Sequence, residues 1–403
     1  MKIDKKHLLD YSIFIPYMIL SVLGLIVVYS TTSANLVQFG ANTFKSVVNQ
    51  GVFWIVSLVI IALVYKMKLN VLRNGKLIAG AIGVEILLLL IARVFGTETN
   101  GAKGWLYLGS FSMQPAEYLK VLIVWFLAYD FARKEDRIAQ EDYLALTKHQ
   151  IFPRKLNDWR LVLAVLIGIV MIMPDLGNAT ILVLTSFIMV SASGIAYRWF
   201  GVLLTTITTI SAFFLGLIWV IGVDTMSKVP VFGYVAKRFS AFFNPFADLA
   251  GSGHQLANSY YAMSNGGWFG MGLGNSIEKR GYLPEAQTDF VFSIVIEEFG
   301  FIGASLILAL LFFLILRIIL VGIRAKNPFN SMMAIGIGGM MLVQTFINIG
   351  GISGLIPSTG VTFPFLSQGG NSVLILSVGI AFVLNISASE KREEVYQSLD
   401  EGQ

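Results

Sequence analysis

The sequence contains no cysteine, and only 13% of its 403 residues are charged. The lack of cysteine excludes disulfides, thiolate metal sites and a thiol nucleophile. In soluble proteins about a quarter of the residues are charged, so this chain is too apolar to form a water-exposed globule. Because 56% of its residues are hydrophobic and lie in long continuous runs, we expect an all-α polytopic membrane protein.

Ten apolar stretches approach the length of about 20 residues that a helix needs to cross the hydrocarbon core. The predicted spans are 12-32, 52-66, 77-95, 115-132, 160-174, 176-194, 198-222, 288-322, 332-352 and 371-388. The second is short, and only residues 173-177 separate the fifth from the sixth. We find no internal repeat and expect one domain over residues 1-403.

Basic residues divide unequally between the two ends of these spans. Most of the 29 Lys and Arg residues fall on the side of the N-terminus. Because Lys and Arg accumulate on the cytoplasmic side of membrane proteins, both termini are predicted to be cytoplasmic. The same rule accounts for the net charge of +5 without any nucleic-acid partner.

Two connections are longer than adjacent helices need. The cytoplasmic loop, about 133-160, is charged and mixed in composition. The extracytoplasmic loop, about 223-287, lies between the seventh and eighth spans and combines aromatic residues, glycines and charges. Long loops without structure are rare in compact proteins unless they serve a function, so we expect the outer loop to carry the site.

Ionisable residues within the predicted spans are also candidates, because such groups are expensive in hydrocarbon and usually face a partner or a cavity. They are Glu85, Glu117, Lys120, Glu297, Glu298 and Arg317. Glu117 and Lys120 share one helix face, so they form either an ion pair that orients the fourth span or part of a site. Glu297 and Glu298 point about 100° apart, so they serve either a proton or ion pathway or helix packing.

The outer loop contains one carboxylate in a distinctive setting. Asp248 comes directly before a glycine-rich turn and a predicted helix from Leu256 to Met263. A second glycine-dense segment, 266-276, would let backbone approach a ligand closely. Thr288 or Asp289 is predicted to cap the eighth span.

The histidines are too few and too scattered for a zinc site, and we predict no bound metal of that kind. A lone outer carboxylate near several cations instead suits attack of a sugar hydroxyl on a lipid-diphosphate sugar. That reaction needs a base for the hydroxyl proton and positive charge for the departing diphosphate. An inverting displacement needs only one such base.

Together these residues resemble the SEDS family (shape, elongation, division and sporulation) over essentially the whole chain. The matching motifs are 100-105, 114-120, 174-179, Asp248 with 253-256, 272-276, 283-290 and 364-372. Lys279 and the following 282-286 favour the cell-division branch of the family over its elongation branch.

The resemblance implies an inverting peptidoglycan glycosyltransferase that polymerises lipid II, the undecaprenyl-diphosphate-linked disaccharide pentapeptide. It would act at the outer face of the cytoplasmic membrane, at the division septum. Its implied partners are a class B penicillin-binding protein, which is a transpeptidase, and other divisome membrane proteins.

The resemblance also implies roles for single residues. Asp248 is expected to be the catalytic base. The substrate-binding residues are expected to be Lys103, Gln114, Glu117, Lys120, His254, Gln255, Lys279, Arg280, Pro284, Glu285 and Ser367. Lys103, Lys120 or the loop cations Lys237, Arg238, Lys279 and Arg280, with or without a divalent ion such as Mg²⁺ or Mn²⁺, would offset charge on the diphosphate.

Two other functions stay open at this point. A lipid II flippase is compatible with ten spans and buried charges, but it needs a polar path through the membrane midplane. A division scaffold without catalytic activity predicts that Asp248 is dispensable.

Overall fold

The computed structural model describes residues 5–38, 44–99, 102–108, 111–147, 158–222 and 233–401. Seven helices in this part of the chain are long and apolar enough to cross a membrane. They are α1 (Tyr11–Gln38), α2 (Phe44–Lys66), α4 (Gly75–Phe95), α9 (Tyr197–Ile221), α13 (Val291–Arg324), α14 (Pro328–Ile352) and α15 (Gly370–Glu401).

Three further helices match the remaining predicted spans. Two of them, α7 (Trp159–Ile172) and α8 (Leu176–Ala192), are apolar but shorter. The third, α5 (Pro115–Ala132), carries three buried ionisable residues, Glu117, Lys120 and Asp130. The prediction of about ten spans in an all-helical membrane bundle is therefore confirmed for the described residues.

Small elements fill the connections. They are η1 (Lys5–Leu8), α3 (Leu69–Leu72), β1 (Thr97–Thr99), β2 (Ala102–Leu108), β3 (Phe111–Met113), α6 (Glu135–Glu141), η2 (Asp142–Thr147), α11 (Gly233–Phe243) and α12 (His254–Gly266). The strands pair antiparallel in the order β1-β2-β3. The predicted helix in the outer loop is α12, which is slightly longer than expected.

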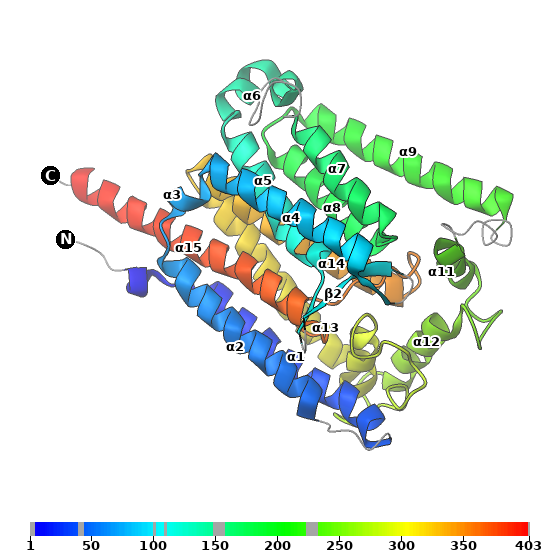
Figure 1. The fold of residues 1–403 in the computed structure, drawn as a ribbon. Helices are drawn as coiled ribbons and strands as arrows, with labels where there is room; N and C mark the ends of the chain where they lie inside the picture. Colours follow the sequence, from blue (N-terminus) through cyan, green and yellow to red (C-terminus); the bar gives the residue numbers. More distant parts are fainter. Residues whose placement is uncertain are drawn as a thin grey trace.

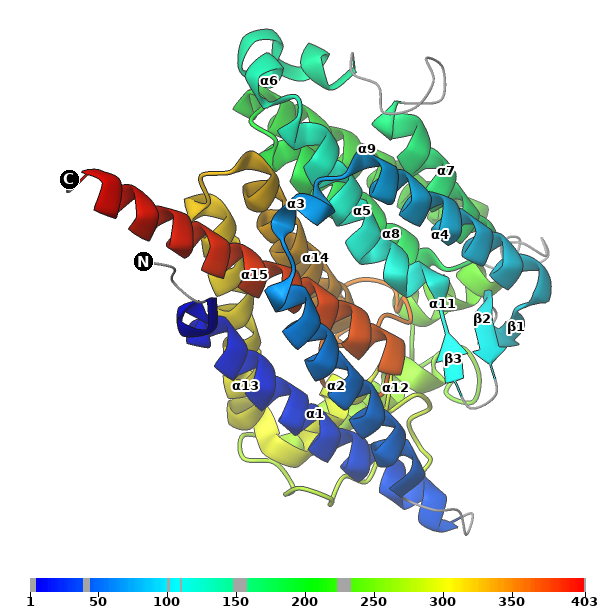
Figure 2. The same ribbon diagram turned by 60° about the vertical axis from the view of Figure 1, so that its left-hand side comes forward.

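The bundle has two distinct ends. In both views the two termini, α3 and α6 lie toward one end, and the small sheet, α11 and α12 lie toward the other (Figures 1 and 2). The termini share an end because an even number of spans returns the chain to its starting side. The outer loop and the strands therefore meet at the end far from the termini.

Helix α14 lies at the centre of this arrangement. Almost every residue on it is buried, and it packs against α5, α8, α13 and α15. Its polar residues Gln344 and Asn348 are buried as well and bond to the segment that precedes α15. A buried central helix with polar side chains near one end thus supports the outer end of the bundle.

Helix α13 is broken at Gly300, where φ is +71°. Two backbone N–H groups after the break donate to the outer loop: Phe301 to the Gly267 carbonyl oxygen at 2.9 Å, and Ile302 to Trp268 at 3.2 Å. A Cβ atom on Gly300 would lie 2.3 Å from the backbone nitrogen of Gly270. The break therefore lets the glycine-dense loop dock directly onto α13, and it requires glycine.

Candidate functional site

A polar cavity of about 380 Å³ opens at the end of the bundle that holds the sheet and the outer loop. Its lining comes from segments far apart in sequence, namely α2, the sheet, α5, the α7–α8 turn, α11, the residues before α13 and those before α15. The lining side chains discussed below are Gln114, Glu117, Asp175, Arg238, Glu285 and Asp289.

Four helices begin at this cavity. Gln114 and Asp175 are the N-caps of α5 and α8, Gly370 is the first residue of α15, and Asp289 stands just before α13. Helix N-termini carry partial positive charge and unpaired N–H groups, so they favour anions. The four helix starts therefore add partial positive charge to a cavity that Arg238 and four carboxylates also line.

Asp175 links two of these helix starts. Its Oδ1 accepts from the backbone N–H of Asn178 at 3.1 Å, and its Oδ2 accepts from Gln114 Nε2 at 3.0 Å. The side chain of Asn178 also donates to Oδ2, at 2.8 Å. These bonds tie the start of α5 to the start of α8, so Asp175 has a positioning role at the cavity wall.

Glu117 and Lys120 form a buried ion pair with 2.8 Å between Nζ and Oε1. Lys120 is 1% exposed and also donates to Gln344 Oε1 on α14 at 3.3 Å. The second carboxylate oxygen of Glu117 has no hydrogen-bond partner, and Glu117 lines the cavity. The pair therefore orients α5 and also leaves an acceptor oxygen at the cavity, while Lys120 lies behind it.

Among the residues that line the cavity, Asp289 is the carboxylate whose pKa its surroundings change most clearly. Burial and, to a smaller extent, the charge of Glu285 raise its pKa, the guanidinium of Arg238 opposes them, and the net pKa is about 7. Arg238 donates to the carbonyl oxygen of Ser358, which holds it near the cavity. A carboxyl group with this pKa can exchange a proton at neutral pH.

The predicted capping role of Thr288 or Asp289 is wrong. The N-cap position of α13 is Phe290, and no side chain caps the helix there. Thr288 instead donates its hydroxyl to Glu285 Oε2 at 2.6 Å. Asp289 is thus free of a capping bond and lines the cavity.

Asp248 lies outside the cavity lining. Its side chain is exposed, and Oδ2 accepts from the backbone N–H of Ser252 at 2.8 Å, which closes the turn before α12. His254 and Gln255, in the first turn of α12, are half-buried and do not line the cavity either. The role of Asp248 as base stays a prediction.

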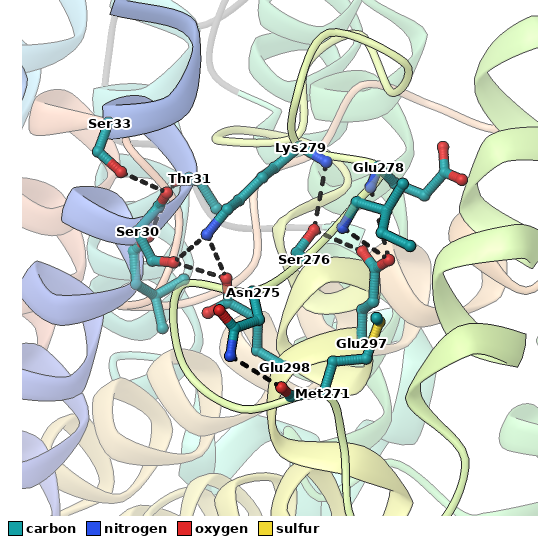
Figure 3. Close-up of polar contacts among 12 residues, drawn as sticks. Ser30, Thr31, Ser33, Met271, Asn275, Ser276, Glu278, Lys279, Glu297 and Glu298 are labelled. Carbon is teal, nitrogen blue, oxygen red and sulfur yellow. Dashed lines mark hydrogen bonds and ion pairs between the residues drawn. The ribbon is translucent and has the colours of Figure 1, made fainter. Parts of the chain in front are cut away.

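Lys279 is buried in a second polar cluster, which Figure 3 shows. Its ammonium lies 2.6 Å from Glu298 Oε1 and 2.8 Å from Ser30 Oγ on α1. The neighbouring Glu297 accepts from the loop, including the backbone N–H of Ile277 at 3.1 Å. Both glutamates therefore serve packing of the outer loop onto α1 and α13, whereas Arg280 is exposed.

The remaining predicted residues are Ser367, Pro284 and Lys103. Ser367 donates to the Thr288 carbonyl oxygen at 2.6 Å and accepts from the Phe363 N–H at 2.7 Å. Pro284 directly precedes Glu285, which lines the cavity. The side chain of Lys103 lies outside the described residues, although its backbone pairs in β2.

A divalent cation fits the described residues poorly. No group of three or more His, Asp or Glu side chains in the described ranges is arranged to hold a metal ion. Of the lining carboxylates, Asp175 accepts from Gln114, Glu117 pairs with Lys120, and Glu285 accepts from Thr288. Asp289 is under the influence of the charge of Arg238.

The residue set found by structure differs from the predicted set in Arg238, Asp175 and Asp289. The sequence placed Arg238 among general loop cations, Asp175 in a motif without a role, and Asp289 at a helix cap. The one available signal was position: Asp175 and Asp289 each lie beside a helix start, whereas Arg238 lies within α11 and had no such signal.

These features define a class: a polytopic helical membrane protein with a polar, anion-compatible cavity at one end. The chain belongs to the FtsW, RodA and SpoVE family, whose model, described as "Cell cycle protein", matches residues 10–392. The predicted membership of this family is therefore confirmed.

Relatives and solved structures agree with this assignment. A Lactococcus lactis protein named "Probable peptidoglycan glycosyltransferase FtsW" is 49% identical over 98% of this chain and 96% of that protein. Its Bacillus subtilis namesake is 34% identical over 96% of this chain and 92% of its own length. Among solved structures, RodA of Thermus thermophilus matches with a TM-score of 0.64 at 22% identity, covering 95% of this chain and 97% of that chain.

A second solved structure shares the fold more closely. It is described as "Structural coordination of polymerization and crosslinking by a peptidoglycan synthase complex". Its matching chain has a TM-score of 0.70 at 23% identity and covers 95% of this chain and 98% of that chain. At this identity the match shows the fold.

Proposed function

We propose that this protein is a peptidoglycan glycosyltransferase that polymerises lipid II into glycan strands. The names of its relatives assign this activity to proteins that cover almost the whole chain. The observation that carries the proposal in this molecule is the cavity at which four helix N-termini, Arg238 and a carboxyl group of pKa about 7 converge.

In the proposed reaction a sugar hydroxyl of one substrate attacks the anomeric carbon of another. The new carbon–oxygen bond forms as the bond to the diphosphate oxygen breaks, with inversion at that carbon. The hydroxyl proton passes to a carboxylate, and the diphosphate leaves with its electron pair. A base and a cationic surround for the leaving group are the two requirements.

Asp289 is the base that the geometry supports. It lines the cavity, while the predicted base Asp248 is exposed and bonded to its own turn. A pKa near 7 gives Asp289 a basic form at neutral pH and a proton affinity suited to the transfer. Asp248 is retained as the competing assignment in the experiment below.

The leaving diphosphate is best accommodated by Arg238 and the helix starts. Arg238 lines the cavity beside Gly360, where a Cβ atom would lie 3.2 Å from Nη2 of Arg238 and 3.4 Å from Oδ2 of Asp289. The base and the cation thus flank one glycine. This arrangement places proton acceptor and positive charge at one cavity wall, as an inverting displacement requires.

Sidedness follows from the same geometry. The small sheet and α11, which help to line the cavity, lie toward the end opposite to the termini (Figure 1). Because basic residues concentrate at the end of the termini, we place both termini in the cytoplasm and the cavity at the outer face of the membrane. We further place the protein at the division septum, which the family description "Cell cycle protein" supports.

The proposed partner is a class B penicillin-binding protein that crosslinks the new strands, together with other divisome membrane proteins. Support comes from the matching fold in a complex described as coordinating polymerisation and crosslinking.

The test is polymerisation of labelled lipid II by the purified protein with its penicillin-binding partner. We expect Asp289→Asn to lose about a hundredfold or more in rate, the scale of general base catalysis, and Asp248→Asn to stay within a few-fold of wild type. Partner binding and thermal unfolding serve as folding controls for both variants. The reverse pattern would assign the base to Asp248, and full activity in both would exclude both aspartates as the base.

A further inference from the structure

A second hollow, of about 360 Å³, lies at the opposite end of the bundle from the catalytic cavity. It forms where α3 and α4 meet, where α5 ends and where α14 begins. Its lining residues are Arg73, Tyr129, Ala132, Arg133, Asn327, Pro328 and Phe329. The proposed glycosyl transfer does not use any of them.

Two guanidinium groups face this hollow. Arg73 Cζ lies 5.6 Å from the ring centroid of Phe329, and its Nη2 donates to Asn330 Oδ1 at 3.1 Å. Arg73 Nε is buried without a hydrogen-bond partner. A buried guanidinium nitrogen without an acceptor is costly, so it marks a position where an anion would be bound favourably.

The second cation is held in place in a similar way. Arg133 Cζ lies 5.3 Å from the ring centroid of Tyr129, and Nη1 donates to the hydroxyl oxygen of the same tyrosine at 2.9 Å. Within the described residues, neither Arg73 nor Arg133 forms an ion pair with a carboxylate. Two fixed positive charges therefore share one hollow without a protein counter-ion there.

The hollow lies at the depth of lipid headgroups. Helix α5 ends at Ala132, α4 begins at Gly75 and α14 begins at Pro328, so three membrane-embedded helices all reach the interface there. Val71 and Leu77, on the adjoining turns of α3 and α4, are exposed apolar side chains. These side chains stand two residues before Arg73 and four after it in the chain, so this turn offers acyl chains an apolar contact.

We propose that this hollow binds the phosphate of an anionic phospholipid of the phosphatidylglycerol or cardiolipin class. The two guanidinium groups bind the phosphate oxygens, and the exposed apolar side chains of α3 and α4 contact the acyl chains. Free phosphate shares the anion chemistry, but the interfacial position and the adjoining apolar surface favour a lipid. The site is independent of the proposed glycosyl transfer.

The test is native mass spectrometry of the full-length protein, released from nanodiscs of phosphatidylglycerol or of phosphatidylcholine. We expect retained phosphatidylglycerol on the wild type, and about thirtyfold weaker retention in Arg73→Gln/Arg133→Gln. The matched control is Lys68→Gln/Lys76→Gln, which removes the same charge from the same end at exposed positions outside the hollow. The control should retain lipid as the wild type does.

Single variants protect the test against misfolding. Arg133 is exposed, so Arg133→Gln should fold normally and still weaken retention. Arg73→Lys, which keeps the charge but loses the planar fork, should weaken retention less than Arg73→Gln.

Several results would overturn the proposal. They are equal retention of the two lipids by the wild type, equal loss in the two double variants, and unchanged retention in the arginine double variant. Thermal stabilisation of lipid-free protein by inorganic phosphate, without any retained phosphatidylglycerol, would assign the hollow to a free anion instead of a lipid.

Discussion

Lys279 and Glu298 form an ion pair with 2.6 Å between Nζ and Oε1, and each side chain is 2% exposed. The pair joins the outer loop to α13 directly before the break at Gly300, and Ser30 of α1 completes it. The loop then continues from Lys279 through Glu285 to Asp289 at the cavity. The position of the proposed base therefore depends on a buried contact between two residues that do not line the cavity.

Replacing Lys279 by Met should destabilise the protein by about 3–5 kcal/mol, because removal of one partner leaves Glu298 as an uncompensated buried charge. Thermal unfolding in detergent measures this change. Arg280→Met is the control, since Arg280 is the exposed neighbour, and it should change stability by less than about 0.5 kcal/mol.

The double variant Lys279→Met/Glu298→Met tests whether the two residues act on each other. If they do, its loss of stability will be clearly smaller than the sum of the two single losses, since no charge is left unpaired. Strict additivity of the single variants would contradict a direct coupling between the side chains.

Gly300→Ala should also destabilise the protein, by more than about 1 kcal/mol, since the new Cβ meets the backbone of the docked loop and φ is +71°. Gly168→Ala in α7 is the matched change, because a Cβ there has no neighbour within 4 Å. It should be neutral or stabilise by about 0.5–1 kcal/mol. Limited proteolysis of the loop 266–276 provides a second readout, and equal effects of the two alanines would refute the docking role of Gly300.

The helices could be predicted closely because their main determinant is the length of each apolar run. The second span shows where this criterion fails. It was predicted to begin at residue 52, whereas α2 begins at Phe44. The prediction missed the early turns of the helix because they contain the polar residues Asn49 and Gln50. Both line the polar cavity, so the residues that hid the helix from a hydropathy criterion belong to the site.

The site was less predictable because it is assembled from distant segments. Asp248 was predicted as the base from the family resemblance; it stands in a turn where it bonds to Ser252, and its role stays a prediction. Asp289 was assigned to a helix cap by its local position, yet its environment is set by Arg238 and Glu285. No local pattern reports that Arg238 of α11 lies beside the residues preceding α13.

Polymerisation should fall as the pH drops below about 7, because Asp289 accepts a proton only in its deprotonated form and burial raises its pKa to about 7. Below that pKa each unit of pH removes about nine-tenths of the remaining base, so the rate should fall about tenfold per unit. Initial rates from about two pH units below 7 to about two above it measure this limb. A rate that is independent of pH over the acid half of this range would exclude Asp289 as the base.

The neighbours of Asp289 should move this acid limb in opposite directions. The charge of Glu285 raises the pKa of Asp289, so Glu285→Gln should shift the limb to lower pH while its amide oxygen still accepts from Thr288. Arg238 lowers that pKa, so Arg238→Gln should shift the limb to higher pH. Rate profiles of the two variants beside wild type check both signs. A merely structural defect would lower the rate at every pH without moving the midpoint. Shifts of the midpoint in opposite directions would therefore identify Asp289 as the titrating group. Identical midpoints would show that the titrating group does not sense Glu285 or Arg238.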